Sequence, residues 1–388
     1  MKQIPYGRQD INQADIDAVV GILRSDLITQ GPAVPRFEKA VASRVRARHA
    51  VAVNSGTSAL HIACRVLGLK PGGMLWTSPV TFVASANCGL YCGAYVDFVD
   101  IDPLTYNISV EALERKLITA EEDGQMPDVV VPVHLCGQSC DMERIHDLSE
   151  CYGFAIIEDA SHAIGGRYKG MHIGNCRYSN ITVFSFHPVK IITTGEGGMA
   201  LTNDDTLAEH MALLRSHGIT RDPAKMTHES EGPWYYQQIE LGYNYRLTDL
   251  QAALGISQMT RLDTYVTRRH ELADRYNRLL ADLPITTPWQ HPDCYSSFHL
   301  YVIRLKREKI TKSHREVFES MRDEGIGVNL HYIPVHTQPL YQRMGFEQGD
   351  FPEAERYYTE AISLPIYPAM TEQQQDLVVD AIRRAVRE

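Results

Sequence analysis

One lysine has an uncommon setting in the stretch SFHPVKIITTGEGG, residues 185–198. Lys190 lies among hydroxyl side chains, a proline and glycines, and the stretch separates two runs typical of strands, NITVF and MALTN. A lysine amine can form a Schiff base with an aldehyde if burial or nearby cations lower its pKa. A lysine in an ordinary surface turn is the alternative, and the stretch alone does not decide between the two.

A second polar group ends the apolar run in FAIIEDASHA, where Glu158 and Asp159 follow buried-type residues. A carboxylate at the end of a buried strand is costly unless a cation pairs with it. A protonated pyridine nitrogen is such a cation, and pyridoxal phosphate (PLP) enzymes place an aspartate there so that the ring withdraws electrons. We expect His162 to support the ring hydroxyl or to orient the aspartate. A pair of metal ligands and a helix cap stay open as alternatives.

A third stretch, VNSGTSAL, predicts a tight turn at Gly56 followed by a helix that Thr57 and Ser58 open. The start of a helix offers unpaired N–H groups and the positive end of its dipole, which suit a phosphate. Plain N-capping by serine or threonine is the common alternative. Ser185 ends a strand and could donate to the same phosphate. The GxxxxGK[ST] pattern of a nucleotide-binding P-loop is absent.

The order of the predicted elements explains how these loops could meet. Between about residues 50 and 205, short runs rich in Val, Ile and Phe alternate with segments of helical periodicity. This alternation predicts an α/β domain with a mostly parallel sheet, whose strands are buried on both faces. Ligand groups in such sheets gather just past the carboxyl ends of the strands, where SGTS, EDASH and SFHPVK all stand.

The pattern changes after about residue 250. A long helical pattern, a strand in SFHLYVIRL, a helix that stops at Gly325 and a final helix predict a smaller C-terminal α+β domain. We therefore expect a large domain over residues 1–255 and a small one over residues 256–388.

Composition narrows the class of protein. The 388 residues are 44% hydrophobic and 22% charged, with a net charge of -10, which is typical of a globular protein and argues against a nucleic-acid partner. No polybasic run or long apolar stretch predicts contact with a membrane, and the N-terminus does not resemble a signal peptide. The eight cysteines form no CxxC pair, so we expect reduced thiols, no metal site and a cytoplasmic location.

Taken together, these motifs resemble the DegT/StrS family of PLP-dependent aminotransferases, which act on nucleotide-linked keto-sugars. The resemblance extends over nearly the whole chain, through LITQGPAVPRFEKA, VNSGTSAL, SPVTFVASAN, EDASHAIGG, GYNYRLTDLQAALG and HYIPVHTQPLY. It implies PLP fold type I. The stretch SFHPVKIITTGEGG is most similar to the pseudaminic-acid branch. Those enzymes transfer the amino group of L-glutamate to the C4 ketone of UDP-4-keto-6-deoxy-L-AltNAc.

The resemblance implies roles for individual residues. Lys190 matches the Schiff-base lysine, Asp159 the partner of the ring nitrogen, and His162 the residue beside the ring. Matches to cofactor contacts are Thr57, Ser58 and Ser185 at the phosphate, Phe82 on the ring face, and Asn244 at the phosphate of the other subunit. Matches to the sugar-nucleotide pocket are Tyr6, Asp26, Leu27, Ile28, Thr29, Gln30, His331, Tyr332, Ile333 and Pro334. Without the resemblance, Phe82 would be interpreted as an ordinary core residue. Asp26 departs from the pattern of the pseudaminic-acid branch, in which a lysine is expected at this position.

Three other functions stay open beside a homodimeric aminotransferase of this branch. An aminotransferase for another UDP- or dTDP-linked 3- or 4-keto-sugar is the strongest rival. A PLP sugar dehydratase would carry histidine in place of Lys190. A regulatory protein that kept the fold without catalysis would not need Lys190, Asp159 and Ser185 together.

Overall fold

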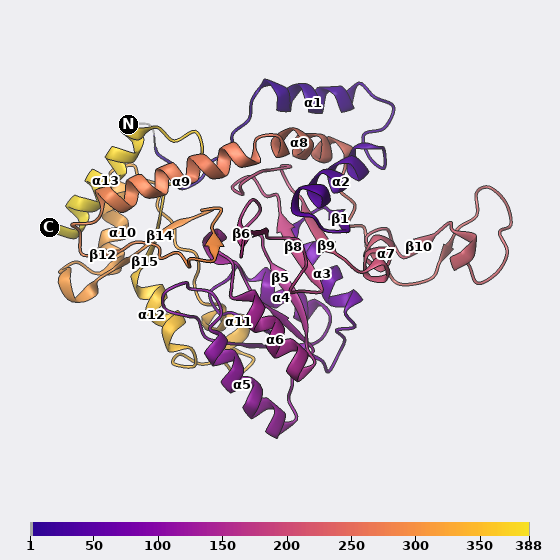
Figure 1. The fold of residues 1–388 in the computed structure, drawn as a ribbon, viewed down its shortest axis with the longest axis horizontal. Coiled ribbons are helices and arrows are strands. Elements are labelled where there is room, and N and C mark those ends of the chain that lie inside the picture. Colours follow the sequence, from indigo (N-terminus) through magenta and orange to yellow (C-terminus); the bar gives the residue numbers. More distant parts are fainter. Residues whose placement is uncertain (1–2, 388) are drawn as a thin grey trace.

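A seven-stranded sheet forms the centre of the molecule in the computed structural model, which describes residues 3–387 (Figure 1). In spatial order its strands are β1 (His49–Val53), β9 (Gly198–Thr202), β8 (Ile181–Ser185), β5 (Ala155–Asp159), β4 (Val129–Val131), β2 (Met74–Thr77) and β3 (Tyr95–Phe98). Neighbouring strands pair in parallel except at β9, which runs antiparallel to both β1 and β8. The predicted mostly parallel sheet is therefore confirmed.

Helices cover both faces of this sheet, which is why its strands are apolar on both sides. One face packs against α3 (Gly56–Val66), α4 (Ala84–Tyr91) and α7 (Asp205–Leu214). The other face packs against α2 (Ala33–Val45), α5 (Val110–Asp123), α6 (Met142–Tyr152) and α8 (Asp249–Met259). Within β5, Ile157 belongs to the α3 face and Ile156 to the opposite face. Because side chains alternate between the two faces of a strand, Asp159 lies on the same face as Ile157, and Glu158 lies on the same face as Ile156.

A smaller antiparallel sheet lies toward the C-terminus, with β14 (Tyr301–Leu305) between β12 (Ile285–Thr286) and β15 (Ala361–Leu364). The helices around it are α9 (Leu262–Leu279), α10 (His314–Asp323), α12 (Pro352–Glu360) and α13 (Glu372–Arg387). The short helix α11 (Pro339–Gln342) packs through Tyr341 on the core of the large sheet. Its core also takes in Ile4, close to the other end of the chain. The division at residues 255 and 256 falls inside α8 and stays a prediction.

Short elements complete the chain. They are α1 (Gln13–Leu23), the small sheet of β6 (Arg167–Tyr168), β7 (Met171–His172) and β13 (Cys294–Tyr295), and the 3-10 turns η1 (Leu135–Gly137), η2 (Pro223–Lys225), η3 (Arg307–Lys309) and η4 (Val335–Thr337). Strands β10 (Ile219–Thr220) and β11 (Gln237–Gln238) form the base of an arm over residues 219–241 that extends away from the body (Figure 1).

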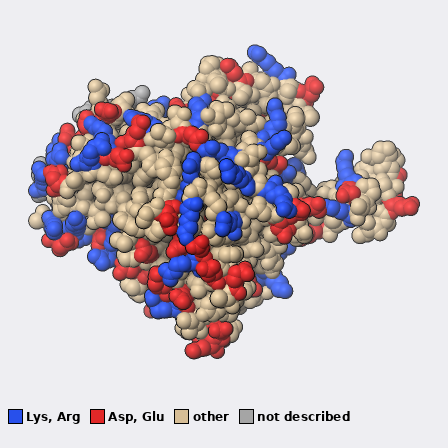
Figure 2. Space-filling model, viewed as in Figure 1, with Lys and Arg blue, Asp and Glu red and all other residues tan. Residues whose placement is uncertain are grey.

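The surface carries charges of both signs. Figure 2 shows basic and acidic residues interspersed over the body, whereas the arm is covered mainly by uncharged residues. None of the helices within residues 3–387 is long and apolar enough to cross a membrane. The eight cysteines of the described chain are all free thiols.

Candidate active site

The loop between β8 and β9 holds Lys190 by backbone hydrogen bonds. Lys190 N–H donates to His187 O at 2.9 Å, and Phe186 N–H donates to Gly197 O at 2.9 Å across the base of the loop. Burial lowers the pKa of the Lys190 ammonium to about 8, and the Asp159 carboxylate acts in the opposite direction. At pH 7 roughly a tenth of the amine is therefore uncharged, far more than for an ordinary lysine, and a Schiff-base lysine requires the uncharged form.

Asp159 lies at the carboxyl end of β5 and is buried. Ser85 Oγ, from α4, donates to Asp159 Oδ2 at 2.6 Å, and Ser161 N–H donates to Oδ1 at 3.1 Å. These two donors orient the carboxylate. His162 has no hydrogen bond to Asp159, so of the two roles expected for it, orientation of the aspartate belongs to Ser85 instead.

Helix α3 begins at Gly56, so Gly56 is the first helical residue rather than part of a preceding turn as the sequence predicted. Ser55 caps the helix by accepting from Ser58 N–H at 3.1 Å. A Cβ on Gly56 would lie 3.0 Å from that of Ser185, so the helix start and the end of β8 are in close contact. A Cβ on Gly198 would lie 2.2 Å from Ser55 O, so Gly198 permits close approach of the backbone, whereas a Cβ on Gly195 would meet nothing within 4 Å.

Four aromatic and imidazole rings surround the lysine end of the site. His162 Nε2 lies 3.1 Å from the Tyr332 hydroxyl, and the rings of His162 and His299 are 4.4 Å apart. Burial, together with the charge of Lys190, lowers the pKa of His331 to about 3 and that of His162 well below its usual value. Burial also lowers the pKa of His299 well below its usual value, with His162 and Lys190 adding to the effect. The three histidines are therefore neutral at physiological pH.

These groups line one cavity of about 510 Å³ at the carboxyl edge of the sheet. Of the residues predicted from sequence, those that line it are Tyr6, Thr57, Phe82, Asp159, His162, Ser185, Lys190, His331 and Tyr332. Residues that sequence reasoning missed include Ser55, Thr81, Ser161, His187, Glu196, His299 and Asn329. Phe82 is 58% exposed, which excludes the interpretation of Phe82 as a core residue.

The other predicted residues lie outside the lining of this cavity. They are Ser58, Asn244, Ile333, Pro334 and the segment Asp26, Leu27, Ile28, Thr29 and Gln30. The Ser58 hydroxyl is occupied by a 2.7 Å hydrogen bond to Asn54 Oδ1. Asn244 is exposed, and residues 26–30 form an exposed segment whose Ile28 O accepts from Asp249 N–H at the start of α8. Within this chain, these groups do not reach the lysine.

Known proteins resemble this chain in both sequence and fold. The sequence profile of the DegT/DnrJ/EryC1/StrS aminotransferase family matches residues 9–383. The chain belongs to this family. The spore coat polysaccharide biosynthesis protein SpsC of Bacillus subtilis is 40% identical, covering 99% of this chain and 97% of that protein. A Campylobacter jejuni protein named UDP-4-amino-4,6-dideoxy-N-acetyl-beta-L-altrosamine transaminase is 37% identical, covering 98% and 96%. Helicobacter pylori PseC, an aminotransferase of pseudaminic acid biosynthesis, superimposes with a TM-score of 0.90 at 30% identity, covering 99% of both chains.

The chain is thus a sugar aminotransferase of PLP fold type I, and members of its family use PLP. The side chains around the cavity fit that cofactor. His162 Nδ1 is buried and has no hydrogen-bond partner within residues 3–387, so it is available to the ring hydroxyl. The first N–H groups of α3 have no partner within the helix, and they line the cavity beside Ser185, where a phosphate would be held. Lys190 and Asp159 provide the amine and the carboxylate that the aldehyde and the ring nitrogen require.

Proposed function

We propose that this aminotransferase moves the amino group of L-glutamate to the C4 ketone of UDP-4-keto-6-deoxy-L-AltNAc, as in pseudaminic acid-type biosynthesis. The Lys190 amine with its lowered pKa and the fixed Asp159 carboxylate, together in one cavity, carry the proposal of amino transfer. The choice of sugar is supported by the C. jejuni relative, because the amino sugar in the name of that protein is the one that this reaction would form. The structural similarity to PseC supports the same choice.

Lys190 would hold the cofactor and move protons. The cofactor supplies an aldehyde that accepts an amine and a ring that withdraws electrons from the adjacent carbon. Once displaced by the amino donor, Lys190 Nζ would be free to take the proton from the α-carbon of glutamate. Glutamate would give up its amino group to the cofactor and, with water supplying the keto oxygen, leave as 2-oxoglutarate. In the second half of the reaction the same amine delivers a proton to C4 of the sugar. A pKa of about 8 suits an amine that must both accept and release a proton.

The remaining side chains would bind and orient. Asp159, fixed by Ser85, keeps the ring nitrogen protonated through its negative charge. Phe82 would lie on the ring face, and Tyr6 and His331, whose rings are 5.2 Å apart, would line the sugar side of the cavity. Neutral histidines around Lys190 avoid a second positive charge that would lower the basicity of its amine further.

We also propose that two copies of the chain share each active site. Lys190 is the only lysine or arginine among the described residues that line the cavity, although the site must bind a phosphate, a diphosphate and the carboxylates of glutamate. Asn244 is exposed at the base of the arm, and Trp234 and Leu241 on the arm are 71% and 73% exposed. A symmetric dimer would bury this surface and let each chain complete its neighbour's site.

A substrate panel tests the choice of sugar. Purified holoenzyme is incubated with L-glutamate and each of several UDP- and dTDP-linked 3- and 4-keto-sugars, and products are identified by mass spectrometry and NMR. We expect efficient amination only at C4 of UDP-4-keto-6-deoxy-L-AltNAc. Preferred amination of a dTDP-linked or 3-keto sugar would overturn the choice of sugar while leaving the aminotransferase activity in place.

A further inference from the structure

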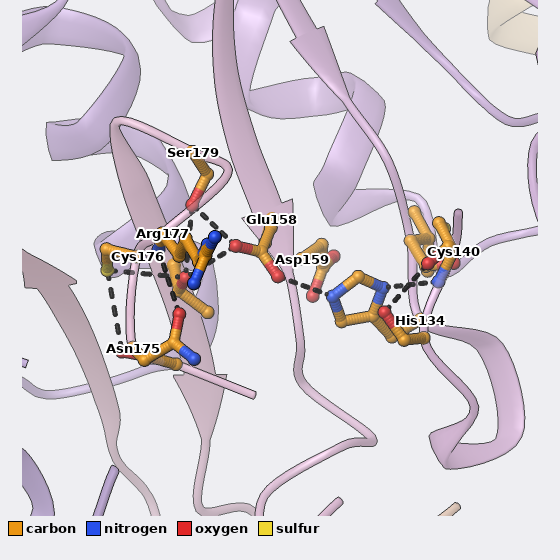
Figure 3. A network of polar contacts seen from close by, with 12 residues as sticks. His134, Cys140, Glu158, Asp159, Asn175, Cys176, Arg177 and Ser179 are labelled. Atoms are coloured by element: carbon orange, nitrogen blue, oxygen red, sulfur yellow. Dashed lines mark hydrogen bonds and ion pairs between the residues drawn. The ribbon is translucent and has the colours of Figure 1, made fainter. Parts of the chain in front are cut away.

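A second buried carboxylate, Glu158, stands one residue before Asp159 and takes no part in the mechanism above. Glu158 is 5% exposed, like Asp159. Because side chains alternate along β5, Asp159 faces the cavity and Glu158 faces the opposite side of the sheet, the side of Ile156, α5 and α6. Figure 3 shows the two carboxylates at neighbouring positions of the strand, with Glu158 between Ser179 and His134.

Three donors surround the Glu158 carboxylate. His134 Nε2 lies 2.7 Å from Oε2, and Oε1 accepts from Ser179 Oγ at 2.5 Å and from Thr182 Oγ1 at 3.1 Å (Figure 3). Burial acts to raise the pKa of Glu158, yet both carboxylate oxygens accept hydrogen bonds and neither donates one, an arrangement that favours the ionised form, and the pKa is lowered overall. The carboxylate is therefore negatively charged at neutral pH.

The hydrogen bonds of His134 show that this negative charge is not neutralised. Cys140 N–H donates to His134 Nδ1 at 3.1 Å, so Nδ1 carries a lone pair and the ring proton is on Nε2. His134 is thus a neutral donor rather than a cation. The nearby thiols of Cys140 and Cys176 have pKa values raised chiefly by burial and partly by Glu158, so they are uncharged too. Arg177 directs its guanidinium to Met171 Sδ, at 3.6 Å.

The same network is joined to the backbone of Asp159. His134 N–H donates to Asp159 O at 3.1 Å, and Asp159 N–H donates to Pro132 O at 2.9 Å. The His134 side chain therefore holds Glu158 while its backbone holds Asp159. The negative charge of Glu158 therefore lies on the residue next to Asp159, whose carboxylate would face the ring nitrogen of the cofactor.

We propose that Glu158, held by His134, is a positioning residue that acts through Asp159: its buried negative charge makes this end of the cavity more negative and favours the protonated state of the bound cofactor. The proposal depends on the cofactor of the family and not on the identity of the sugar. It therefore stands or falls separately from the choice of substrate.

The test uses the absorption band of the bound cofactor, which changes with its protonation and needs no turnover. Glu158→Gln removes the charge but keeps the size and an oxygen that can accept from His134 Nε2. The titratable groups that line the cavity are unchanged in this variant: Tyr6, Asp159, His162, His187, Lys190, Glu196, His299, His331 and Tyr332. The midpoint is the pH at which half of the absorbance change has occurred. Loss of one nearby negative charge should lower this midpoint by about one pH unit.

Two controls separate charge from structure. Glu150→Gln makes the same chemical change at an exposed position of α6 and should leave the midpoint where it is in the unmodified holoenzyme. Ser179→Ala removes one hydrogen bond to Glu158 but keeps the charge, so its midpoint should also stay. If Glu158→Gln does not fold, the double variant Glu158→Gln/His134→Gln, whose amides can pair, replaces it. A midpoint unchanged without the Glu158 charge, or shifted equally by Ser179→Ala, would overturn the proposal.

Discussion

At the scale of single residues, Asp159 and Lys190 divide the chemistry between them. Asp159 carries the negative charge that the ring nitrogen needs, and Ser85 and Ser161 fix its orientation. Lys190 supplies an amine whose pKa burial lowers to about 8. Each property leads to a prediction.

Asp159→Asn should slow the reaction of holoenzyme with glutamate by orders of magnitude, because a neutral amide cannot hold the ring nitrogen protonated. Ser85 can still donate to the amide oxygen, so the fold should be retained. Stopped-flow absorbance of the glutamate half-reaction measures this rate. Rates equal to those of the unmodified enzyme would remove Asp159 from its role.

The lowered pKa of Lys190 predicts how cofactor capture depends on pH. In apoenzyme, only the uncharged amine attacks the aldehyde, so the rate of PLP capture should rise with pH and level off above a midpoint near 8. A free lysine would give a midpoint near 10.4. The rate is followed by the growth of the bound-cofactor band at a series of pH values, and a midpoint near 10 would contradict the buried environment of Lys190.

At the scale of elements, the order of strands and loops was predictable from sequence. Strands that are buried on both faces, such as ITVFS in β8, are recognisable in the sequence as continuous apolar runs. The carboxyl ends of parallel strands meet at one edge of the sheet. This rule alone brought Lys190, Asp159 and Ser185 together. Their arrangement in one cavity follows from parallel pairing and not from any property of the separate loops.

The residues that sequence reasoning missed come from contacts between distant segments. Ser85 lies 74 positions from Asp159 and carries no local sign of a partner. His299 stands two residues before strand β14, where a polar residue beside an apolar run is the only hint. Its carbonyl accepts from Arg269 of α9 at 3.1 Å, and its ring lies 4.4 Å from that of His162. Ser58 was predicted as a phosphate contact, which stays a prediction; its hydroxyl donates to Asn54 Oδ1 at 2.7 Å.

One contact between helix α8 and the start of helix α2 stabilises the N-terminal segment. Asp249, buried at the start of α8, accepts from Gly31 N–H at 2.7 Å and from Ala33 N–H at 2.6 Å, so it also satisfies the start of α2. Asp249→Asn should lower the free energy of unfolding by about 1.5–3 kcal/mol, because a charge-assisted bond is lost. Urea unfolding at fixed protein concentration measures the change, with the exposed Asp123→Asn as control. Equal stability of the two variants would contradict this role.

At the scale of the whole molecule, the proposed dimer explains features that one chain leaves without a use. The arm over residues 219–241 extends from the body (Figure 1). Trp234 on the arm is exposed, and the exposed Asn244, just after the arm in sequence, does not line the cavity of its own chain. If the Asn244 amide donates to the cofactor phosphate of the other subunit, that bond is worth about 1.5–3 kcal/mol. Asn244→Ala should then weaken PLP retention about ten- to hundredfold.

Subunit exchange tests whether Asn244 acts on the partner. Lys190→Ala and a strongly disabled Asn244 variant are each inactive, and they are mixed so that hybrid dimers form. If Asn244 acts in trans, one site of the hybrid carries both defects and the other carries neither, so activity returns. If the mixture stays inactive although hybrids are detected, Asn244 acts within its own chain.

The central claim is that Lys190 and Asp159 serve a cofactor that carries an amino group from glutamate to a keto-sugar. The most direct measurement is the absorption spectrum of purified holoenzyme during sequential additions. We predict a yellow band that L-glutamate bleaches with release of 2-oxoglutarate, and that UDP-4-keto-6-deoxy-L-AltNAc then restores. Lys190→Ala, which cannot transfer the protons, should show neither change at a comparable rate. A holoenzyme whose band glutamate does not bleach, or that no keto-sugar restores, would contradict the account.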